Sequence, residues 1–488
     1  MLPPVSLPPM RALTVASFWL LAVLTGACKR SKPEPLPATM LPGSSSAAVP
    51  AASSSEPRAP LTVLRRARLI DGLGSPVIEG VSVLIEGATI RAIGPGASVQ
   101  VPAGATEIDL DGKTVMPGMV SDHAHVGLVD DATSGPEKDT RANVLRALVQ
   151  FEAYGVTTIT SLGMNGSVFY ELQPGLHAGT LAGADLFGAD RGLGVPLAAP
   201  PVKVEPDHLY RPATADEARE NVRETARRHP SLVKIWVDDF HGTLSAKMSP
   251  DIYGAIIDEA HKQGLRVAAH VYYLADARQL VEAGVDVLAH GVRDRGVDDA
   301  FIASLKAHRT WYIPTLDLDE ASFIYAERPA WMQTPFFRNT LRPVLAAQVD
   351  DPYWQKRVLG DQEKVATDRR SLATNMANFK RLYDAGVSIG FGTDAGAQPL
   401  RIPGFAEHRE LHLMVAAGVT PLQAISLATS RAAALLHLDD RGVLAPGKLA
   451  DLVVIDGHPD TAIDDTSHIV AVWHRGKQVS GPVEAFRP

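Results

Sequence analysis

Two histidines separated by a single residue, His123 and His125, follow an apolar run at residues 114–120. An apolar run of this length is typical of a short buried strand, and residues i and i+2 of a strand point to the same face. The two imidazoles can therefore reach one point, and imidazole is a common ligand for zinc and similar metals. The competing interpretation is a chance pair of histidines in a polar loop.

Four more side chains with metal-binding or catalytic chemistry stand in or directly after other apolar runs. Each belongs to a different run, so the four can meet the two histidines only if these runs lie side by side in the fold. Imidazole, carboxylate and amine groups gathered in this way predict a metal site rather than a solvated surface. The four residues are Lys234, His270, His290 and Asp394.

The elements that must position these residues alternate between short apolar runs and longer helical stretches. Eight strand–helix units predict an α/β fold with a (β/α)8 barrel, whose active site lies at the C-terminal ends of the strands. We predict strands at 115–120, 157–162, 186–188, 233–237, 266–270, 285–290, 312–315 and 388–393. Helices are predicted at 215–228, 250–263, 275–283 and 372–385.

The two ends of the folded region share a different pattern. In residues 61–114, short Val, Ile and Leu runs alternate with Gly and Asp, and similar runs return in residues 441–488. Such runs with tight turns indicate β-strands, and lone strand pairs are only marginally stable. We therefore predict that both ends form one small β-sandwich beside a barrel domain of residues 115–440.

The first 60 residues have the character of an export signal and a tether. Residues 12–27 are almost wholly apolar, follow Arg11, and end in small residues before Cys28, the single cysteine. Residues 1–28 resemble a signal segment with a bacterial lipoprotein cleavage box, in which Cys28 is lipidated. Residues 29–60, rich in Pro, Ser and Ala, predict a disordered tether.

This leader predicts a lipid-anchored protein of the bacterial cell envelope, with the folded domain in the periplasm or outside. A plain secretory signal or a retained anchor are the alternatives. The composition of 45% apolar and 21% charged residues is that of a globular protein. The net charge of −8 and the lack of a basic run argue against a nucleic-acid partner. A small-molecule substrate and a homo-oligomer are compatible with these features.

Several motifs together resemble the amidohydrolase superfamily, in its imidazolonepropionase-like and Xaa-Pro dipeptidase-like branch. They are residues 117–125, His270, His290, residues 392–394, residues 405–422 and residues 442–456. The resemblance implies two divalent metal ions, with zinc as the default expectation. One metal would take His123, His125 and Asp394, and the other His270 and His290. Lys234, carboxylated by carbon dioxide, would bridge them as a carbamate.

The reaction that this resemblance implies is hydrolysis of an amide-type C–N bond by a metal-bridging hydroxide. Two metals lower the pKa of a bridging water. Asp394 would take the proton of that water and return it to the leaving amine. The expected substrates are dipeptides, N-acyl amino acids or cyclic amides.

Three residues near the predicted rim are candidates for substrate binding: Tyr272, Tyr273 and Arg293. An arginine can bind a substrate carboxylate through two parallel hydrogen bonds. A tyrosine can donate to the same group or to an oxyanion. Alternatively, Arg293 pairs with Asp294 or Asp298, and Tyr273 packs in the wall.

Two other functions remain open at this point. The first is a mononuclear deaminase-like or cyclic amidine hydrolase, in which Lys234 is structural and pairs with Asp238 or Asp239. The second is a non-catalytic exported binding lipoprotein. The long segment 317–371, rich in aromatic residues, is either an active-site lid or a small helical subdomain.

Overall fold

The computed structural model describes residues 59–201 and 208–488. The predicted signal segment, Cys28 and nearly all of the predicted tether lie outside the described residues. None of the helices in the described part combines the length and the apolar composition that a membrane crossing requires.

Seven regular strands form two parallel sheets in the middle of the chain. The first sheet has three strands and the second has four, and each strand pairs in parallel with its neighbour. The first holds β6 (Met119–Ala124), β9 (Val156–Ser161) and β10 (Asp185–Gly188). The second holds β11 (Val233–Trp236), β12 (Val267–His270), β13 (Val287–Leu288) and β14 (Trp311–Tyr312).

Three isolated parallel bridges join the two sheets into a closed ring. They are Ala189–Leu232, Tyr312–Ile389 and Ala124–Ala395. The first connects β10 to β11, while the other two place residues 389–395 between β14 and β6. This segment is thus the eighth strand, and it pairs with its neighbours through isolated bridges only. The closed ring of eight parallel strands is the predicted (β/α)8 barrel.

The first predicted strand, 115–120, is in fact two strands that belong to different sheets. β5 (Thr114–Pro117) pairs with strands of the terminal β-domain, whereas β6 begins at Met119 and enters the barrel. Gly118 lies between the two strands. A side chain does not fit at this position, because a Cβ would lie 2.3 Å from Thr157 Oγ1. The apolar pattern runs through both strands, so hydrophobicity alone could not locate the break.

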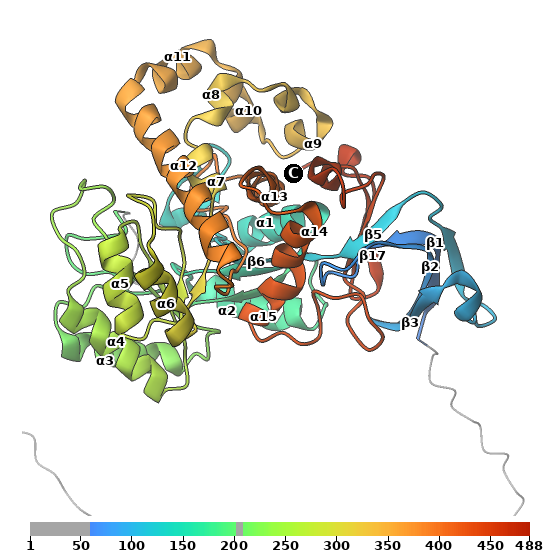
Figure 1. The fold of residues 1–488 in the computed structure, drawn as a ribbon, viewed down its shortest axis with the longest axis horizontal. Coiled ribbons are helices and arrows are strands. Elements are labelled where there is room, and N and C mark those ends of the chain that lie inside the picture. The colour runs from blue at the N-terminus through green and yellow to red at the C-terminus, as the bar shows by residue number, and fades with distance from the viewer. Residues whose placement is uncertain (1–58, 202–207) are drawn as a thin grey trace, which may run out of the picture. The chain divides into compact units, whose positions relative to one another are not determined.

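Helices follow the barrel strands and cover the ring, as Figure 1 shows. They are α1 (Arg141–Ala153), α2 (Ser167–His177), α3 (Ala215–Ala226), α4 (Pro250–Lys262), α5 (Leu274–Glu282), α6 (Asp299–His308), α12 (Gln362–Asp384) and α13 (Phe405–Ala416). Helix α12 begins at Gln362 rather than at the predicted residue 372. The side chain of Asp361 accepts a hydrogen bond from the Lys364 backbone N–H and caps this polar first part of the helix.

Strands from the two ends of the folded region share one eight-stranded sheet. Its order is β17 (Lys477–Ser480), β16 (Ile469–His474), β15 (Leu452–Ile455), β5, β1 (Leu61–Leu69), β2 (Ile78–Glu86) and β3 (Thr89–Pro95), with β4 (Thr106–Asp109) paired to β1. β5 joins the two ends by antiparallel pairing with β15. Figure 1 shows the blue N-terminal strands and the red strand β17 in the same part of the molecule, and within the sheet β16, β15 and β5 lie between them.

The aromatic residues of segment 317–371 pack both against one another and against residues outside the segment. The rings of Tyr325 and Phe337 stack with centroids 5.6 Å apart, and Trp331 lies 5.2 Å from both Phe337 and Phe405. These rings belong to the same buried core as the barrel and come from a helical segment. Its helices are α7 (Asp317–Glu320), α8 (Ile324–Glu327), α9 (Pro335–Arg338), α10 (Pro343–Asp350) and α11 (Pro352–Gly360).

Candidate metal centre

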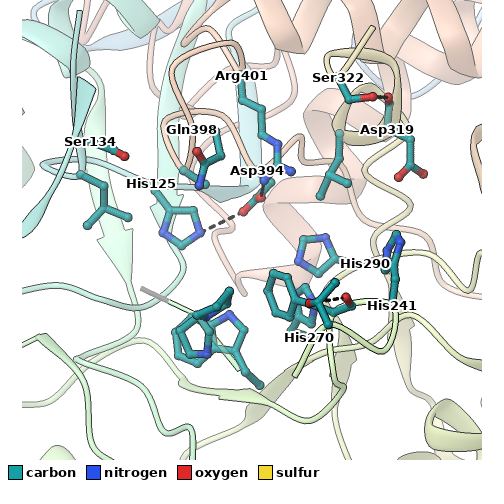
Figure 2. A pocket seen from close by; sticks show the side chains of 18 of the residues that line it. His125, Ser134, His241, His270, His290, Asp319, Ser322, Asp394, Gln398 and Arg401 are labelled. Carbon is teal, nitrogen blue, oxygen red and sulfur yellow. Dashed lines mark hydrogen bonds and ion pairs between the residues drawn. The ribbon is translucent and has the colours of Figure 1, made fainter. Parts of the chain in front are cut away.

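Four imidazoles and one carboxylate converge at the C-terminal rim of the barrel. Asp394 Oδ1 lies 3.1 Å from His123 Nε2 and 3.0 Å from His125 Nε2. The ring of His290 lies 4.5 Å from that of His123 and 4.4 Å from that of His270, measured between centroids. Figure 2 shows His125, His270, His290 and Asp394 around one space. The five side chains are thus placed where the barrel strands end.

Hydrogen bonds from the other ring nitrogen orient two of these imidazoles. His123 Nδ1 lies 2.6 Å from the carbonyl oxygen of Ala289, and His125 Nδ1 lies 3.3 Å from that of Gly163. A carbonyl oxygen can only accept, so Nδ1 carries the proton in both rings. Their Nε2 atoms are therefore left with a free lone pair, as a metal ligand requires.

Burial keeps the central imidazoles neutral. Desolvation lowers the pKa of His123 to about 3, and the nearby Lys234 adds to this effect. Burial also lowers the pKa of His290 well below its usual value and lowers that of His270. A neutral imidazole is the form that binds a metal ion.

Lys234, on β11, points into this cluster rather than toward solvent. Its side chain is fully buried, and its Nζ forms no hydrogen bond with any of the described residues. Burial lowers the pKa of Lys234 to about 7, although Asp394 and Asp238 partly oppose that change. The amine is thus available in its neutral form near neutral pH, and a neutral amine can react with carbon dioxide.

The alternative in which Lys234 pairs with a neighbouring carboxylate is not what the structure shows. Asp238 accepts a hydrogen bond from the Phe240 backbone N–H, and Asp239 accepts one from the Tyr273 hydroxyl. Gly163 makes room for the lysine, since a Cβ there would approach Lys234 Cγ to 3.1 Å. The backbone of Gly163 also has a φ of +100°, which favours glycine.

Asp394 is held by its backbone and by an arginine. It has a left-handed φ of 64°, and its N–H donates to the carbonyl oxygen of His123 at 2.9 Å. Arg401 forms an ion pair with its second oxygen. Burial alone would raise the pKa of Asp394, but Arg401, His123 and His125 hold it well below its usual range. The group is therefore a carboxylate at neutral pH.

The donor set fits divalent metal ions. His123, His290 and Asp394 each offer one ligand atom, and these three atoms lie within 4.8 Å of one another. His123 Nε2 and Lys234 Nζ are buried and form no hydrogen bond. Leaving such groups unpaired costs about 1–3 kcal/mol each, a cost that bound cations with their ligands would remove.

Of the three predicted substrate-binding residues, only Arg293 lines the cavity above the metal centre. Its Nη1 donates to Asp319 Oδ1 at 3.3 Å, and its buried Nε forms no hydrogen bond. The alternative partners behave differently. Asp294 accepts from the Leu274 backbone N–H, and Asp298 pairs with Arg278. Arg293 therefore keeps donor capacity for a ligand.

The hydroxyls of Tyr272 and Tyr273 contact other protein groups, so a role of these residues in substrate binding stays a prediction. The Tyr273 hydroxyl donates to Asp239 Oδ1 at 2.9 Å, and the Tyr272 hydroxyl lies 3.0 Å from Ser371 Oγ. Neither residue is among those that line the cavity. Both hydroxyls are thus engaged with protein groups.

The cavity over the metal centre has a volume of about 1050 Å³ and two unlike halves. The segments after β6 and β9 and the C-terminal end of β11 contribute most of the apolar side chains together with Glu137, whereas the segments after β13, β14 and the eighth strand contribute most of the charged ones. Since the strand order follows the ring, these two sets face each other across the ligands. The apolar set is Leu128, Met164, Trp236 and Phe240, and the charged set includes Arg293, Asp319 and Arg401.

Sequence reasoning missed Arg401 and Asp319 and considered Asp238 only as a partner of Lys234. Arg401 stands in the loop after the eighth strand, and Asp319 stands in the short helix α7 after β14, both outside any periodic pattern. Asp238 directly follows a buried run, which was the one signal available. His408, in helix α13, lies outside the centre. Its ring nitrogens form hydrogen bonds with the Thr466 hydroxyl and the Tyr154 carbonyl oxygen.

Residues 114–480 match the family model of the amidohydrolase family. An uncharacterized protein of Mycobacterium tuberculosis is 31% identical over 259 residues, which cover 51% of this chain and 60% of that protein. Ochratoxinase from Aspergillus niger is 23% identical over 478 residues, 89% of each chain. Imidazolonepropionase from Streptomyces coelicolor is 25% identical over 424 residues, 82% of this chain and 92% of the enzyme.

Solved structures show the same fold. An Xaa-Pro dipeptidase with bound methionine superposes with a TM-score of 0.68 at 23% identity, and covers 86% of this chain and all of its own. The crystal structure of A. niger ochratoxinase gives a TM-score of 0.68 at 21% identity, over 87% of this chain and 97% of its own. At these identities the likeness concerns the architecture.

Proposed function

The chain belongs to the amidohydrolase family, and from this premise we propose that it is a metal-dependent hydrolase of amide-type C–N bonds in small substrates. One observation carries the proposal. Four imidazoles and Asp394 converge around a buried lysine whose Nζ has no hydrogen-bond partner. The similarity to an imidazolonepropionase and to an Xaa-Pro dipeptidase supports the same class of reaction.

The same residues would hold two metal ions. His123, His125 and Asp394 would bind one ion, His270 and His290 the other, and a carbamate on Lys234 would bridge them. When bound, such a pair lowers the pKa of water and polarises a carbonyl group. Zinc suits nitrogen and oxygen ligands of this kind, and manganese, cobalt or iron would fit the same donors.

The chain's own groups then divide the remaining tasks. Asp394 lines the cavity, so its carboxylate can accept a proton from the attacking water and return it to the leaving amine. Its ion pair with Arg401 holds the carboxylate in position. The neutral imidazoles add no charge that would compete with the cations.

The two halves of the cavity support substrates with one apolar and one anionic end. Arg293 can bind a carboxylate through its unpaired Nε and its second amino group. The opposite wall, with Trp236 and Phe240, suits an acyl group or an apolar side chain. N-acyl amino acids and dipeptides have both features, so we place them before cyclic amides.

Metal analysis and a substrate library test this proposal. Purified protein loaded with zinc is expected to hold two equivalents per chain and to release amines from a panel of dipeptides and N-acyl amino acids. One equivalent per chain would favour the mononuclear alternative. The absence of metal and of hydrolysis would favour the non-catalytic binding protein.

We also propose that the enzyme is anchored at the cell envelope through lipidated Cys28, on the strength of the apolar run and small residues before it. Labelling of cells with a palmitate analogue is expected to mark the wild type and not the Cys28→Ser variant. Equal labelling of both proteins, or of neither, would contradict this localisation.

A further inference from the structure

Asp238 lies two residues beyond the end of β11, and the two-metal arrangement above gives it no role. Its side chain is fully buried, and its Oδ1 accepts a hydrogen bond of 3.0 Å from the Phe240 backbone N–H. Its Oδ2 lies 3.2 Å from His270 Nε2 but forms no hydrogen bond. This oxygen is thus held close to a ligand imidazole without bonding to it.

The same contact occurs on the other side of the metal centre. Asp394 Oδ1 lies 3.1 Å from His123 Nε2, and that nitrogen also forms no hydrogen bond. Two ligand atoms of one tetrahedral zinc, each about 2.0–2.1 Å from the ion, are about 3.3 Å apart. A separation near this value without a hydrogen bond is expected when both lone pairs point to a common ion.

The charge around Asp238 also favours a bound cation. An ionised carboxylate that is buried needs a positive partner or full hydrogen bonding. Within residues 59–201 and 208–488, no lysine or arginine nitrogen forms an ion pair with this group. His270 is its contact, and Arg293 lowers its pKa without forming an ion pair with it. A cation beside His270 would satisfy Oδ2.

We propose that Asp238 is a carboxylate ligand of the second metal, together with His270 and His290. This inference rests on the two-metal function proposed above. Each ion would then be held by two histidines and one aspartate, with Lys234 between them. Because the chain itself supplies this anionic ligand, the second metal would depend less on carbon dioxide than a site with a carbamate alone.

Zinc titration of the metal-free protein tests this role without measuring activity. Wild type is expected to bind two zinc ions, whereas Asp238→Asn keeps the first affinity and binds the second at least about tenfold more weakly. Asp239→Asn is the matched control, since the Asp239 carboxylate accepts from Tyr273 and from the Gly242 N–H, outside the centre. This control is expected to bind both ions like the wild type.

Cobalt spectra separate a ligand from a residue that only orients His270. With cobalt in the second site, Asp238→Asn is expected to change the visible absorption bands, because the coordination shell loses an anionic oxygen donor. Weaker binding with unchanged bands would overturn the proposal, and so would two zinc ions bound with wild-type affinity.

Folding of the variant is checked by circular dichroism of the metal-free proteins. Asp238→Ser is a second, smaller variant that is expected to behave like Asp238→Asn. Should the wild type itself bind fewer than two ions, the two-metal function would fail, and that result is distinct from the failure of the Asp238 assignment.

Discussion

Buried polar groups at the two ends of the barrel differ in their hydrogen bonding. At the N-terminal face, Asp185 opens β10 with a fully buried side chain, and its Oδ2 accepts hydrogen bonds from Arg441 at 2.8 Å and Arg475 at 2.9 Å. Its Oδ1 contacts His177. At the C-terminal rim, Lys234 Nζ, His123 Nε2 and Asp238 Oδ2 are equally buried and form no hydrogen bond.

This difference separates structural from functional polar groups. Buried polar atoms in native proteins almost always have partners. Both side-chain oxygens of Asp185 follow that rule, although the Nε of its partner Arg475 forms no hydrogen bond within the described residues. At the C-terminal rim, several buried polar atoms that face one another have no hydrogen-bond partner among the described residues. Such atoms are expected where a bound ligand supplies the missing partner. In a (β/α)8 barrel the C-terminal face carries catalysis and the opposite face carries stability.

The largest expected effect concerns Lys234. Replacing it with alanine should lower kcat/KM by at least about a thousandfold, comparable to the loss of one main electrostatic group in an active site. The variant should also lose one equivalent of metal, because the bridge is gone. Short carboxylates such as acetate should restore part of the activity.

The stability of metal-free Lys234→Ala should equal or exceed that of the wild type, since a buried unpaired amine is removed. Metal analysis and chemical denaturation measure the two quantities. An unchanged metal content in this variant would break the contrast between the two barrel ends.

Asp185→Asn is the reciprocal change at the N-terminal face. Removing one partner from a buried ionic cluster should lower the free energy of unfolding by about 3 kcal/mol. The metal content and kcat/KM should stay near wild type at temperatures where the variant is folded. Urea denaturation measures the loss, with Asp258→Asn, an exposed carboxylate, as the control.

Arg293→Met tests the charged half of the cavity. The loss of a charge-assisted hydrogen bond, about 1.5–3 kcal/mol, should raise KM for substrates with a free carboxylate by about 10–100-fold. The same substrates with a carboxamide in place of the carboxylate should be hydrolysed equally by variant and wild type. Steady-state kinetics on the matched pair of substrates measures both KM values. An unchanged KM for the carboxylate substrate would show that its carboxylate binds elsewhere.

The smallest expected effect is a pH dependence from His474. Burial opposes its charge, but a hydrogen bond to Glu152 and the nearby Asp451 raise its pKa above 6.5. The protonated form is favoured in the fold, so the stabilisation is complete below pH 6.5 and is lost as the pH rises through the folded pKa.

The His474→Gln variant should remove this component. The stability difference between wild type and variant should therefore shrink from pH 6 to pH 8 in metal-free protein. A difference that stays constant over this range would show that His474 is uncharged in the fold.

Much of the barrel was predictable because its strands are buried on both faces and read as apolar runs. The boundaries of the strands and helices were less predictable. The break at Gly118 depends on contact with Thr157, which lies in another strand. The start of α12 depends on the capping carboxylate of Asp361, ahead of any apolar periodicity. Contacts between distant segments leave no trace in a local pattern.

The candidate side chains of the centre could be identified from their positions along the chain. His123, His125, His270, His290 and Asp394 each end an apolar run, and the ends of parallel strands meet at one rim. Which atoms face one another depends on the folded ring. The fold places the hydroxyls of Tyr272 and Tyr273 against protein groups, pairs Arg293 with Asp319, and leaves Asp238 Oδ2 beside His270 without a hydrogen bond. Loops after strands carry no periodicity, so their contacts depend on the packing of the whole ring.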